Sequence, residues 1–374
     1  MRLEASVPAK VLAAVRGPFA AAGGTSFNAP IAEPLSLYLD LAGEALRERL
    51  FLVQGPGREE FCLRPDFTLA TARAHIASGA ASGRYGYEGP AFRVAPAGGG
   101  RTEQFLQIGL EAYEDGDAPS ADAAMARLAW EAALAGGRED LSLLFGDVAL
   151  FAAFLAAIEI AEPVAARLRT AFAHPWRLAR ELDTAKADGE ADEGPLAGLL
   201  RGLGEREAAA VLEEIWALAG IQPVGGRTAP DIVRRLARRA AAGSAPRLST
   251  AESDMIGRYL AIVDEPAAAL AAVAALAGGG TGPLAAVLAA WERRLTALGE
   301  AGAGRRRLAT AFARGFGYYD GVLFEVRSEA LGQDQPVAAG GRYDSLPARL
   351  GSPLPTGAVG CMVRPGRAWR DGEP

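Results

Sequence analysis

Two polar side chains, Gln107 and Glu111, lie in an apolar stretch of the sequence and indicate a site for a small polar ligand. Large apolar residues alternate with other residues here, which is typical of a strand. The two faces of such a strand carry different sets: Phe105, Gln107, Gly109 and Glu111 on one, and Leu106, Ile108 and Leu110 on the other. The second face belongs on a core. An amide, a gap at glycine and a carboxylate on the first face suit a ligand better than solvent.

Another carboxylate, Asp66, lies beside Thr68 in the segment Leu-Arg-Pro-Asp-Phe-Thr (63–68). Pro65 fixes a turn out of a strand, and a helical pattern begins soon after it. Asp66 could therefore cap that helix, an arrangement worth about 1 kcal/mol. Alternatively, its carboxylate and the Thr68 hydroxyl point at the ammonium group of a ligand. From this stretch alone, we favour the cap.

Strands and helices predicted elsewhere must position these side chains. A strand at 84–93 is joined to 105–111 by a loop that ends in three glycines, and Gly55-Pro56-Gly57 and Asp320-Gly321 both predict hairpin turns. Other strands are expected at 25–31, 50–54, 60–63, 141–145, 307–311, 317–326 and 337–341. Helices are expected at 8–22, 34–48, 120–134 (capped by Ser120 or Asp122) and 148–158.

The composition changes in the middle of the chain. Residues 163–294 contain helical segments and glycine-rich joints with almost no strand pattern, so we expect a helical insertion there, within a core formed by 1–162 and 295–374. The longest uncharged run, 266–291, is cut at 278–283 by a glycine-rich turn into pieces too short to cross a bilayer. It therefore predicts two buried, alanine-rich helices and no association with a membrane.

Charge and composition exclude several classes of function. The net charge of −6 and the pI near 5.3 argue against a nucleic-acid partner. The two cysteines, Cys62 and Cys361, lack CxxC spacing and resemble reduced cytosolic thiols, and the N-terminus has no secretory signal, so we expect a cytoplasmic protein. The two histidines, His75 and His174, have no companions at ligand spacing, and we therefore expect no metal, no cofactor and no His-based catalytic triad.

Five segments, taken in order, resemble the histidyl-tRNA synthetase catalytic core over roughly residues 1–160 and 300–364. They are Leu-Arg-Pro-Asp-Phe-Thr (63–68), Tyr-Glu-Gly-Pro-Ala-Phe-Arg (87–93), Gly-Arg-Thr-Glu-Gln-Phe-Leu-Gln-Ile-Gly-Leu-Glu (100–111), Arg-Gly-Phe-Gly-Tyr-Tyr (314–319) and Gly-Gly-Arg-Tyr-Asp (340–344). Each segment alone is a weak indication of the family, but the presence of all five in this order is specific to it. The resemblance implies an α+β fold with a class II aminoacyl-tRNA synthetase-like core, an antiparallel six-stranded sheet flanked by helices.

The resemblance also implies a histidine site. Asp66 and Thr68 would meet the ammonium group, and Gln107 the backbone end of the ligand. A carboxylate that accepts an imidazole N–H (Glu111) and a phenol that donates or accepts (Tyr319) would select a ring with two nitrogens. Arginine forks would meet carboxylate or phosphate oxygens. The expected histidine-binding set is Asp66, Thr68, Arg93, Gln107, Glu111, Arg314, Tyr318 and Tyr319.

The chain also departs from the synthetase pattern. Its loop at 94–100 has no charged side chain, although the synthetase loop contacts ATP and the tRNA end, and Glu103 stands where a second basic residue is usual. Arg101 would be a vestige of the ATP site. The arginine expected to meet the ATP phosphates could be Arg364 or Arg367. We expect no anticodon-binding domain.

These departures are similar to those of the ATP phosphoribosyltransferase regulatory subunits, synthetase paralogues that do not aminoacylate. The similarity implies a non-catalytic chain whose partner is a short-form catalytic subunit, which performs the first step of histidine biosynthesis. It further implies homodimers within a hetero-octamer, with histidine as the feedback effector. Two alternatives stay open: a truncated synthetase core that still adenylates histidine, and a histidine-binding module with an unrelated partner.

Overall fold

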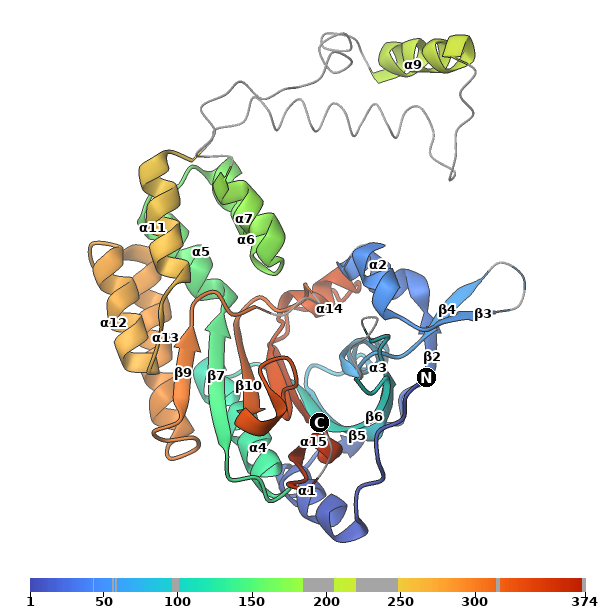
Figure 1. Ribbon diagram of the computed structural model, residues 1–374, viewed down its shortest axis with the longest axis vertical. Coiled ribbons are helices and arrows are strands. Elements are labelled where there is room, and N and C mark those ends of the chain that lie inside the picture. The colour runs from blue at the N-terminus through green and yellow to red at the C-terminus, as the bar shows by residue number, and fades with distance from the viewer. Residues whose placement is uncertain are drawn as a thin grey trace.

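A mixed nine-stranded sheet forms the centre of the molecule (Figure 1). The structure is a computed structural model, and it describes residues 1–42, 44–55, 57, 59–95, 101–183, 205–219, 248–313 and 317–371. The strands lie in the order β1-β5-β6-β12-β11-β10-β7-β9-β8. Their bounds are β1 Thr25–Ser26, β5 Gly83–Phe92, β6 Gln104–Tyr113, β7 Leu141–Asp147, β8 Val263–Asp264, β9 Arg306–Ala309, β10 Val322–Ser328, β11 Ala338–Arg342 and β12 Ala358–Val363.

The prediction of a six-stranded antiparallel sheet is wrong. Six neighbouring strands, from β5 across to β7, do pair antiparallel. However, β1 pairs with β5 and β9 pairs with β7 in parallel, and β8 extends the far edge. Alternation within a segment identifies a strand but not its partner. These short edge strands join segments far apart in the sequence, so their pairing was not predictable from local pattern.

One face of the sheet is covered by α1 (Ala9–Ala22) and α4 (Ala118–Leu134), which pack on its central strands. The prediction for the apolar face of β6 is confirmed, because Ile108 and Leu110 belong to this core. Asp117 caps α4, so the expected caps, Ser120 and Asp122, are wrong. The side chain of Asp122 instead lies inside the protein, where it forms ion pairs with Arg294 and Arg342.

The opposite face of β6 contacts α3 (Thr68–Ser78). Near α3 lies a small sheet of β2 (Ala32–Pro34), β4 (Glu60–Leu63) and β3 (Leu52–Gln54), with α2 (Leu35–Ala42) and the 3-10 helix η1 (Glu44–Arg49). The antiparallel β3–β4 pair confirms the first predicted hairpin.

The second predicted hairpin, at Asp320-Gly321, is wrong, because β10 begins only at Val322. Asp320 instead accepts hydrogen bonds from the backbone N–H groups of Asp344 and Ser345. It thereby satisfies donors at the start of α14 (Ser345–Arg349), which would otherwise have no partner within the helix.

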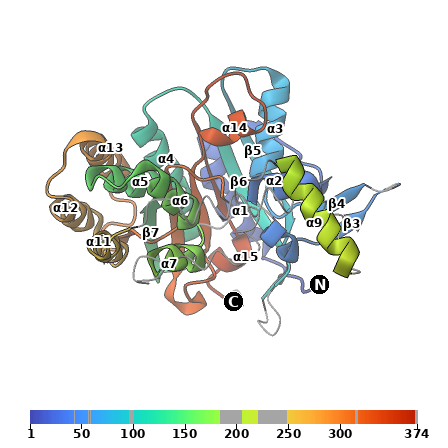
Figure 2. The same ribbon diagram turned by 90° about the horizontal axis from the view of Figure 1, so that it is seen from above.

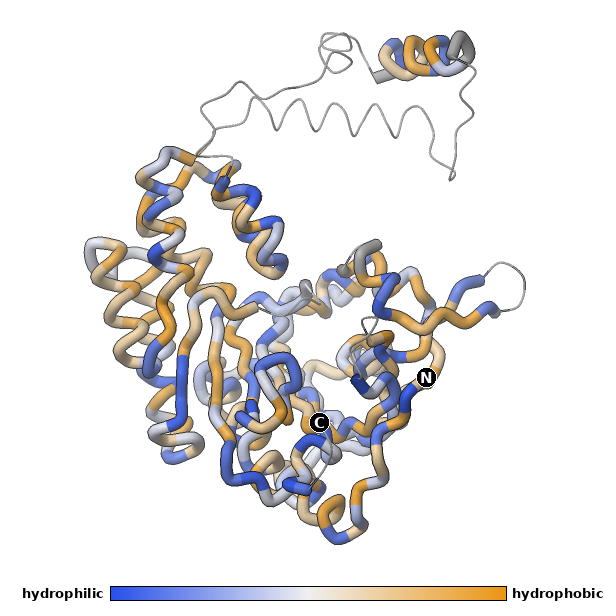
Figure 3. Tube along the Cα trace, in the orientation of Figure 1, coloured by the Kyte–Doolittle hydropathy of each residue, from blue (hydrophilic) through white to orange (hydrophobic). Residues whose placement is uncertain are grey.

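A group of helices gathers at the β7–β9–β8 end of the sheet (Figures 1 and 2). Figure 3 shows many apolar residues in α12 and α13, which confirms the predicted alanine-rich pair. The prediction that both helices are buried is wrong, because most of their residues are exposed or only partly buried. Apart from β8, the described elements between 163 and 294 are helical, while the boundaries of the insertion stay a prediction. Among the described residues, no helix is long and apolar enough to cross a membrane. The helices of this group are α5 Val148–Ala157, α6 Glu162–Phe172, α7 Pro175–Asp183, α11 Thr250–Leu260, α12 Pro266–Leu276 and α13 Gly282–Leu298. The other helices are α9 Glu205–Ala219, η2 Glu329–Leu331 and α15 Pro365–Ala368.

Candidate functional site

A compact pocket, which we call the carboxylate pocket, lies on the α3 side of the sheet. It has a volume of about 20 Å³. Its described lining contains two carboxylates and no cationic side chain. A ligand that carries a positive charge therefore suits it. The lining residues are Asp66, Thr68, Tyr87, Gln107, Glu111, Tyr318, Tyr319, Ala339, Gly340, Gly360, Cys361 and Met362.

Glu111 is buried in this pocket and is held by three hydroxyl groups. One carboxylate oxygen accepts hydrogen bonds from Thr68 (2.9 Å) and Tyr87 (3.3 Å), and the other accepts one from Tyr343. The packing requires glycine at position 360, because a Cβ there would overlap the carboxylate. Burial raises the pKa of Glu111 to about 7, although the hydroxyl groups oppose this rise. The carboxylate is fixed in one orientation and can still accept an N–H from a ligand.

Asp66 faces the pocket and does not cap α3, contrary to the interpretation favoured from the sequence. The helix begins at Thr68 with Phe67 in the N-cap position, one residue later than capping by Asp66 requires. The Phe67 ring stacks on Tyr87 at 4.3 Å between centroids, which fixes this turn. The Tyr318 hydroxyl donates to Asp66 at 3.4 Å. The alternative, a carboxylate that faces a ligand, fits the geometry better.

Gln107 presents an amide that the fold does not satisfy. Its side chain is only 1% exposed, and neither Oε1 nor Nε2 has a hydrogen-bond partner among the described residues. A buried polar group left in this way costs roughly 1–3 kcal/mol. Because an amide both donates and accepts, it could bind either the ammonium or the carboxylate of an amino acid. A polar ligand in the pocket would recover this energy.

A second, larger cavity of about 430 Å³ adjoins the pocket and shares Met362 with it. We call it the arginine cavity. Two acidic side chains, Glu325 and Asp334, line it beside the aromatic rings of Phe105 and Phe312. An excess of guanidinium groups suits an anion with several oxygens. The arginines in its described lining are Arg49, Arg93, Arg101, Arg327, Arg364 and Arg367.

Both arginines that the sequence left as alternatives, Arg364 and Arg367, lie in this cavity. Arg364 forms an ion pair with Glu4 at 2.8 Å. Arg367 donates to the Pro336 carbonyl at 3.1 Å and forms no ion pair with the described acidic residues. Burial, together with the positive charge of Arg364, lowers the pKa of Arg367 to about 8. An anion in the cavity would stabilise its protonated form.

The predicted site residues divide between the two cavities. Arg93 lines the arginine cavity, where its Nε donates to the Pro65 carbonyl at 2.9 Å. Arg101 also lines it and forms an ion pair with Asp334 at 3.0 Å. Arg314 lies outside the described residues. The six that line the carboxylate pocket together are Asp66, Thr68, Gln107, Glu111, Tyr318 and Tyr319.

Sequence reasoning missed two tyrosines that hold Glu111. Tyr87 lies opposite Gly109 in the β5–β6 register, and a Cβ at Gly109 would overlap its ring. The gap at glycine is therefore filled by Tyr87 and not by a ligand. Tyr343 belongs to the Gly-Gly-Arg-Tyr-Asp segment but was given no role. In the described part of the chain, no group of three or more His, Cys, Asp or Glu side chains could hold a metal ion.

Comparisons with known proteins match the chain to histidyl-tRNA synthetases and to ATP phosphoribosyltransferase regulatory subunits. The histidyl-tRNA synthetase family model matches residues 3–215 and 208–364. An ATP phosphoribosyltransferase regulatory subunit of Brucella anthropi is 32% identical over 340 residues, which cover 89% of each chain. The protein of the same name from Brucella canis is 33% identical over 329 residues and 86% of each chain.

Solved structures show the same fold. One is described as an ATP phosphoribosyltransferase regulatory subunit/histidyl-tRNA synthetase from Bacillus halodurans. It aligns with a TM-score of 0.64 at 21% identity, over 97% of this chain and 78% of the other. Another, a histidine--tRNA ligase subunit from Alicyclobacillus acidocaldarius, gives a TM-score of 0.56 at 19% identity, over 98% and 94%.

Proposed function

Because this chain belongs to the family of ATP phosphoribosyltransferase regulatory subunits, we propose that it binds and regulates the catalytic subunit of that enzyme. The chain is not itself the catalyst. The activity resides in a short-form catalytic partner, which carries out the first step of histidine biosynthesis. The alignment to the Brucella anthropi relative spans most of both chains, so the inference concerns a whole subunit rather than a shared fragment.

The effector is histidine, bound in the carboxylate pocket. Its ammonium group pairs with Asp66 and Thr68, and its imidazole lies between Glu111 and Tyr319, with Tyr318 beside it. The single observation that carries this assignment is the Gln107 amide, buried without a described partner in a pocket that has two carboxylates and no described cation. A zwitterion with a second N–H donor supplies what these groups lack.

The carboxylate of histidine lies at the border with the arginine cavity. Met362 lines both cavities, so a ligand that fills the pocket can extend its negative end toward the guanidinium groups. Arg93 supplies the positive charge there. Arg314 is assigned the same role from the resemblance to the synthetases alone.

Homodimers of the chain form part of a cytoplasmic hetero-octamer, without a nucleic-acid or membrane partner. The net charge of −6 supports the absence of nucleic acid. Histidine regulates by binding one state of the assembly more tightly than another, since an effector with equal affinity for both states shifts nothing.

Co-expression with a short-form phosphoribosyltransferase tests the proposal. We expect the two chains to co-elute, the transferase to gain activity and added histidine to lower it. Calorimetry with and without the transferase then locates the effector site. A transferase that is fully active alone and never co-elutes with this chain would falsify the proposal.

The arginine cavity favours a second candidate function, adenylation of histidine. Several guanidinium groups adjoin the pocket, where they could bind the phosphates of ATP. Histidine-dependent pyrophosphate exchange by the purified chain tests this function. Clear exchange supports an enzyme, whereas no exchange beside measurable histidine binding supports the regulatory subunit.

A further inference from the structure

The first residues of the chain lie along the start of β6, beside the arginine cavity. The N–H groups of Glu103 and Gln104 donate to the Arg2 carbonyl at 2.8 and 3.1 Å. The Glu4 N–H donates to the Gln104 carbonyl at 2.9 Å. We call residues 2–4 the N-terminal strap. These few backbone hydrogen bonds hold it against the same strand that carries Gln107 and Glu111.

The strap brings one carboxylate, that of Glu4, to the arginine cavity. One oxygen accepts a hydrogen bond from the Leu106 N–H at 3.1 Å, and the other pairs with Arg364 at 2.8 Å. The Glu4 side chain is 13% exposed and that of Arg364 is 5% exposed. Glycine at position 366 makes room for it, because a Cβ there would overlap the carboxylate. The Glu4 side chain is therefore largely buried and closely packed, unlike a charged side chain on the surface.

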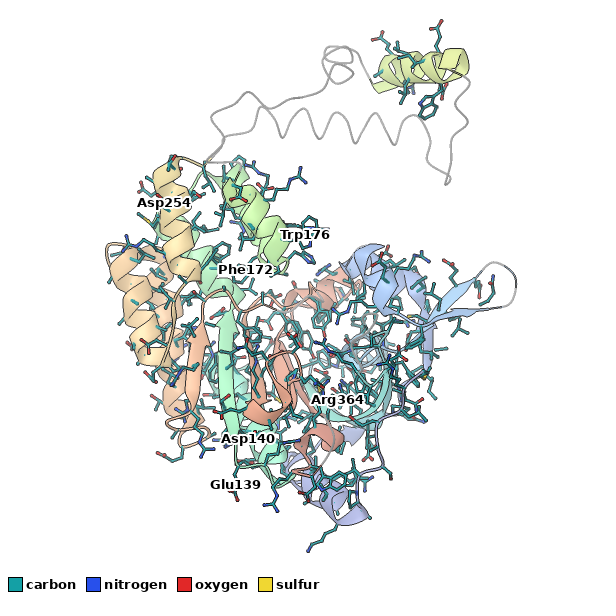
Figure 4. The ribbon with its side chains drawn as sticks, viewed as in Figure 1. Glu139, Asp140, Phe172, Trp176, Asp254 and Arg364 are labelled. Carbon is teal, nitrogen blue, oxygen red and sulfur yellow. The ribbon has the colours of Figure 1, made fainter. Side chains whose placement is uncertain are left out.

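Arg364 is held by internal groups yet is not fully satisfied by them. A single guanidinium nitrogen donates to both Glu4 and Thr102, and the guanidinium group lies 3.7 Å from the centroid of the Phe105 ring (Figure 4 labels Arg364). Its Nε is buried and has no partner among the described residues. Nearby Arg367 forms no ion pair with the described acids. The cavity thus offers more cationic donors than its own carboxylates use.

We propose that Glu4 is a built-in competitor that occupies Arg364 until a phosphate-bearing anion enters the arginine cavity and displaces the strap. A phosphate group carries more charge and more acceptor oxygens than one carboxylate, so it can bind Arg364 and Arg367 together. Displacement breaks the backbone hydrogen bonds of the strap. By linkage, anion binding and strap release then favour each other.

The substitution Glu4→Gln tests the proposal, with inorganic triphosphate and ATP as separate probes in calorimetry at low salt. Removing a competitor should tighten triphosphate binding by at least about tenfold, the lower end of what one hydrogen bond to a charged group contributes. Glu88→Gln, which breaks the Arg16–Glu88 ion pair on the surface, is the matched control and should bind as the wild type does. An equal gain for triphosphate and ATP attributes the effect to the phosphates, whereas a gain for ATP alone contradicts the displacement of Glu4 by a phosphate group.

If Glu4 instead positions Arg364 for the anion, the same substitution weakens binding, and that result overturns the proposal. Unchanged binding, or no triphosphate binding to either protein, overturns it as well.

Hydrogen exchange of the wild-type protein gives a readout that needs no substitution. Triphosphate should speed exchange at the N–H groups of Glu103, Gln104 and Leu106, which donate to the strap. Equal or slower exchange contradicts displacement. Neither measurement uses histidine or the transferase, so failure here is distinct from failure of the proposed function.

Discussion

The carboxylate pocket and the arginine cavity adjoin at Met362 but differ in how their charged side chains are held. In the pocket, neutral hydroxyl groups hold Glu111, which forms no ion pair with the described residues. In the arginine cavity, acidic side chains form ion pairs that neutralise the positive charge of several arginines. The ion pairs there are Glu4–Arg364, Asp334–Arg101 and Glu325–Arg327.

This difference indicates which of the two regions can bind a ligand without first breaking an internal ion pair. Hydroxyl groups orient the carboxylate without forming an ion pair with it, so Glu111 can accept an N–H once the pocket, about 20 Å³ in volume, opens to admit a ligand larger than water. An anion in the arginine cavity must first compete with carboxylates already bound there. Substitutions in the pocket should therefore change ligand affinity strongly, whereas those at the exposed ion pairs of the cavity should change little.

The largest effect is expected for Glu111→Gln. The substitution keeps the size of the side chain but removes the charged acceptor for an imidazole N–H, so histidine affinity should fall by about a hundredfold, roughly 3 kcal/mol. Calorimetry measures the affinity, and circular dichroism checks that the fold survives. Glu114→Gln, which breaks an exposed ion pair with Arg84 just beyond β6, is the control and should bind normally. Undiminished affinity in Glu111→Gln would remove Glu111 from the site.

The raised pKa of Glu111 predicts that stability depends on pH in a defined direction. Burial raises its pKa from 4.5 to about 7 in the folded protein, so the unfolded chain releases this proton more readily. The resulting stabilisation is present below about pH 4.5 and is lost as the pH rises through about 7. It amounts to roughly 3 kcal/mol at most.

Urea unfolding of the wild type and of Glu111→Gln across this range measures the effect. The groups that also face Glu111 are Asp66, whose charge raises its pKa, and the hydroxyls of Thr68, Tyr87 and Tyr343, which lower it. Because both proteins keep these groups, the difference between the two curves isolates Glu111. Parallel curves would show that burial leaves its titration unchanged.

The sequence predicted which side of β6 carries the polar side chains of the carboxylate pocket, because alternation is a local property. Gln107 and Glu111 had to share a face opposite Ile108 and Leu110, and they do. The resemblance to the synthetases added Tyr318 and Tyr319, which no local pattern could have placed beside them.

What the sequence missed depends on contacts between distant segments. Asp66 does not cap α3, because the helix begins at Thr68 with Phe67 in the N-cap position, and the Phe67 ring stacks on Tyr87 of β5, a contact that no local pattern predicts. The Tyr343–Glu111 hydrogen bond joins β6 to the residue that follows β11, and β12 lies between these two strands in the sheet. Nor does any local pattern bring Glu4 to Arg364, near the other end of the chain.

A smaller change in affinity is expected for Gln107→Met. The variant loses an amide that has no hydrogen-bond partner among the described residues, so its free energy of unfolding should rise by about 1 kcal/mol. Histidine affinity should fall by about tenfold, since the ligand loses a hydrogen bond. Gln104→Met, at the first residue of the same strand, is the control for affinity. Loss of stability in Gln107→Met would mean that the amide already has a structural role.

The smallest effect is expected for Arg101→Gln, at the rim of the arginine cavity. The side chains of Arg101 and Asp334 are 37% and 79% exposed, so solvent screens their ion pair. The free energy of unfolding should change by less than about 0.5 kcal/mol in urea. Triphosphate affinity should fall less than about threefold, because the buried arginines remain. A tenfold loss would place the anion at the rim of the cavity rather than at Arg364 and Arg367. The rim arginine Arg101 would then bind the anion despite its ion pair with Asp334.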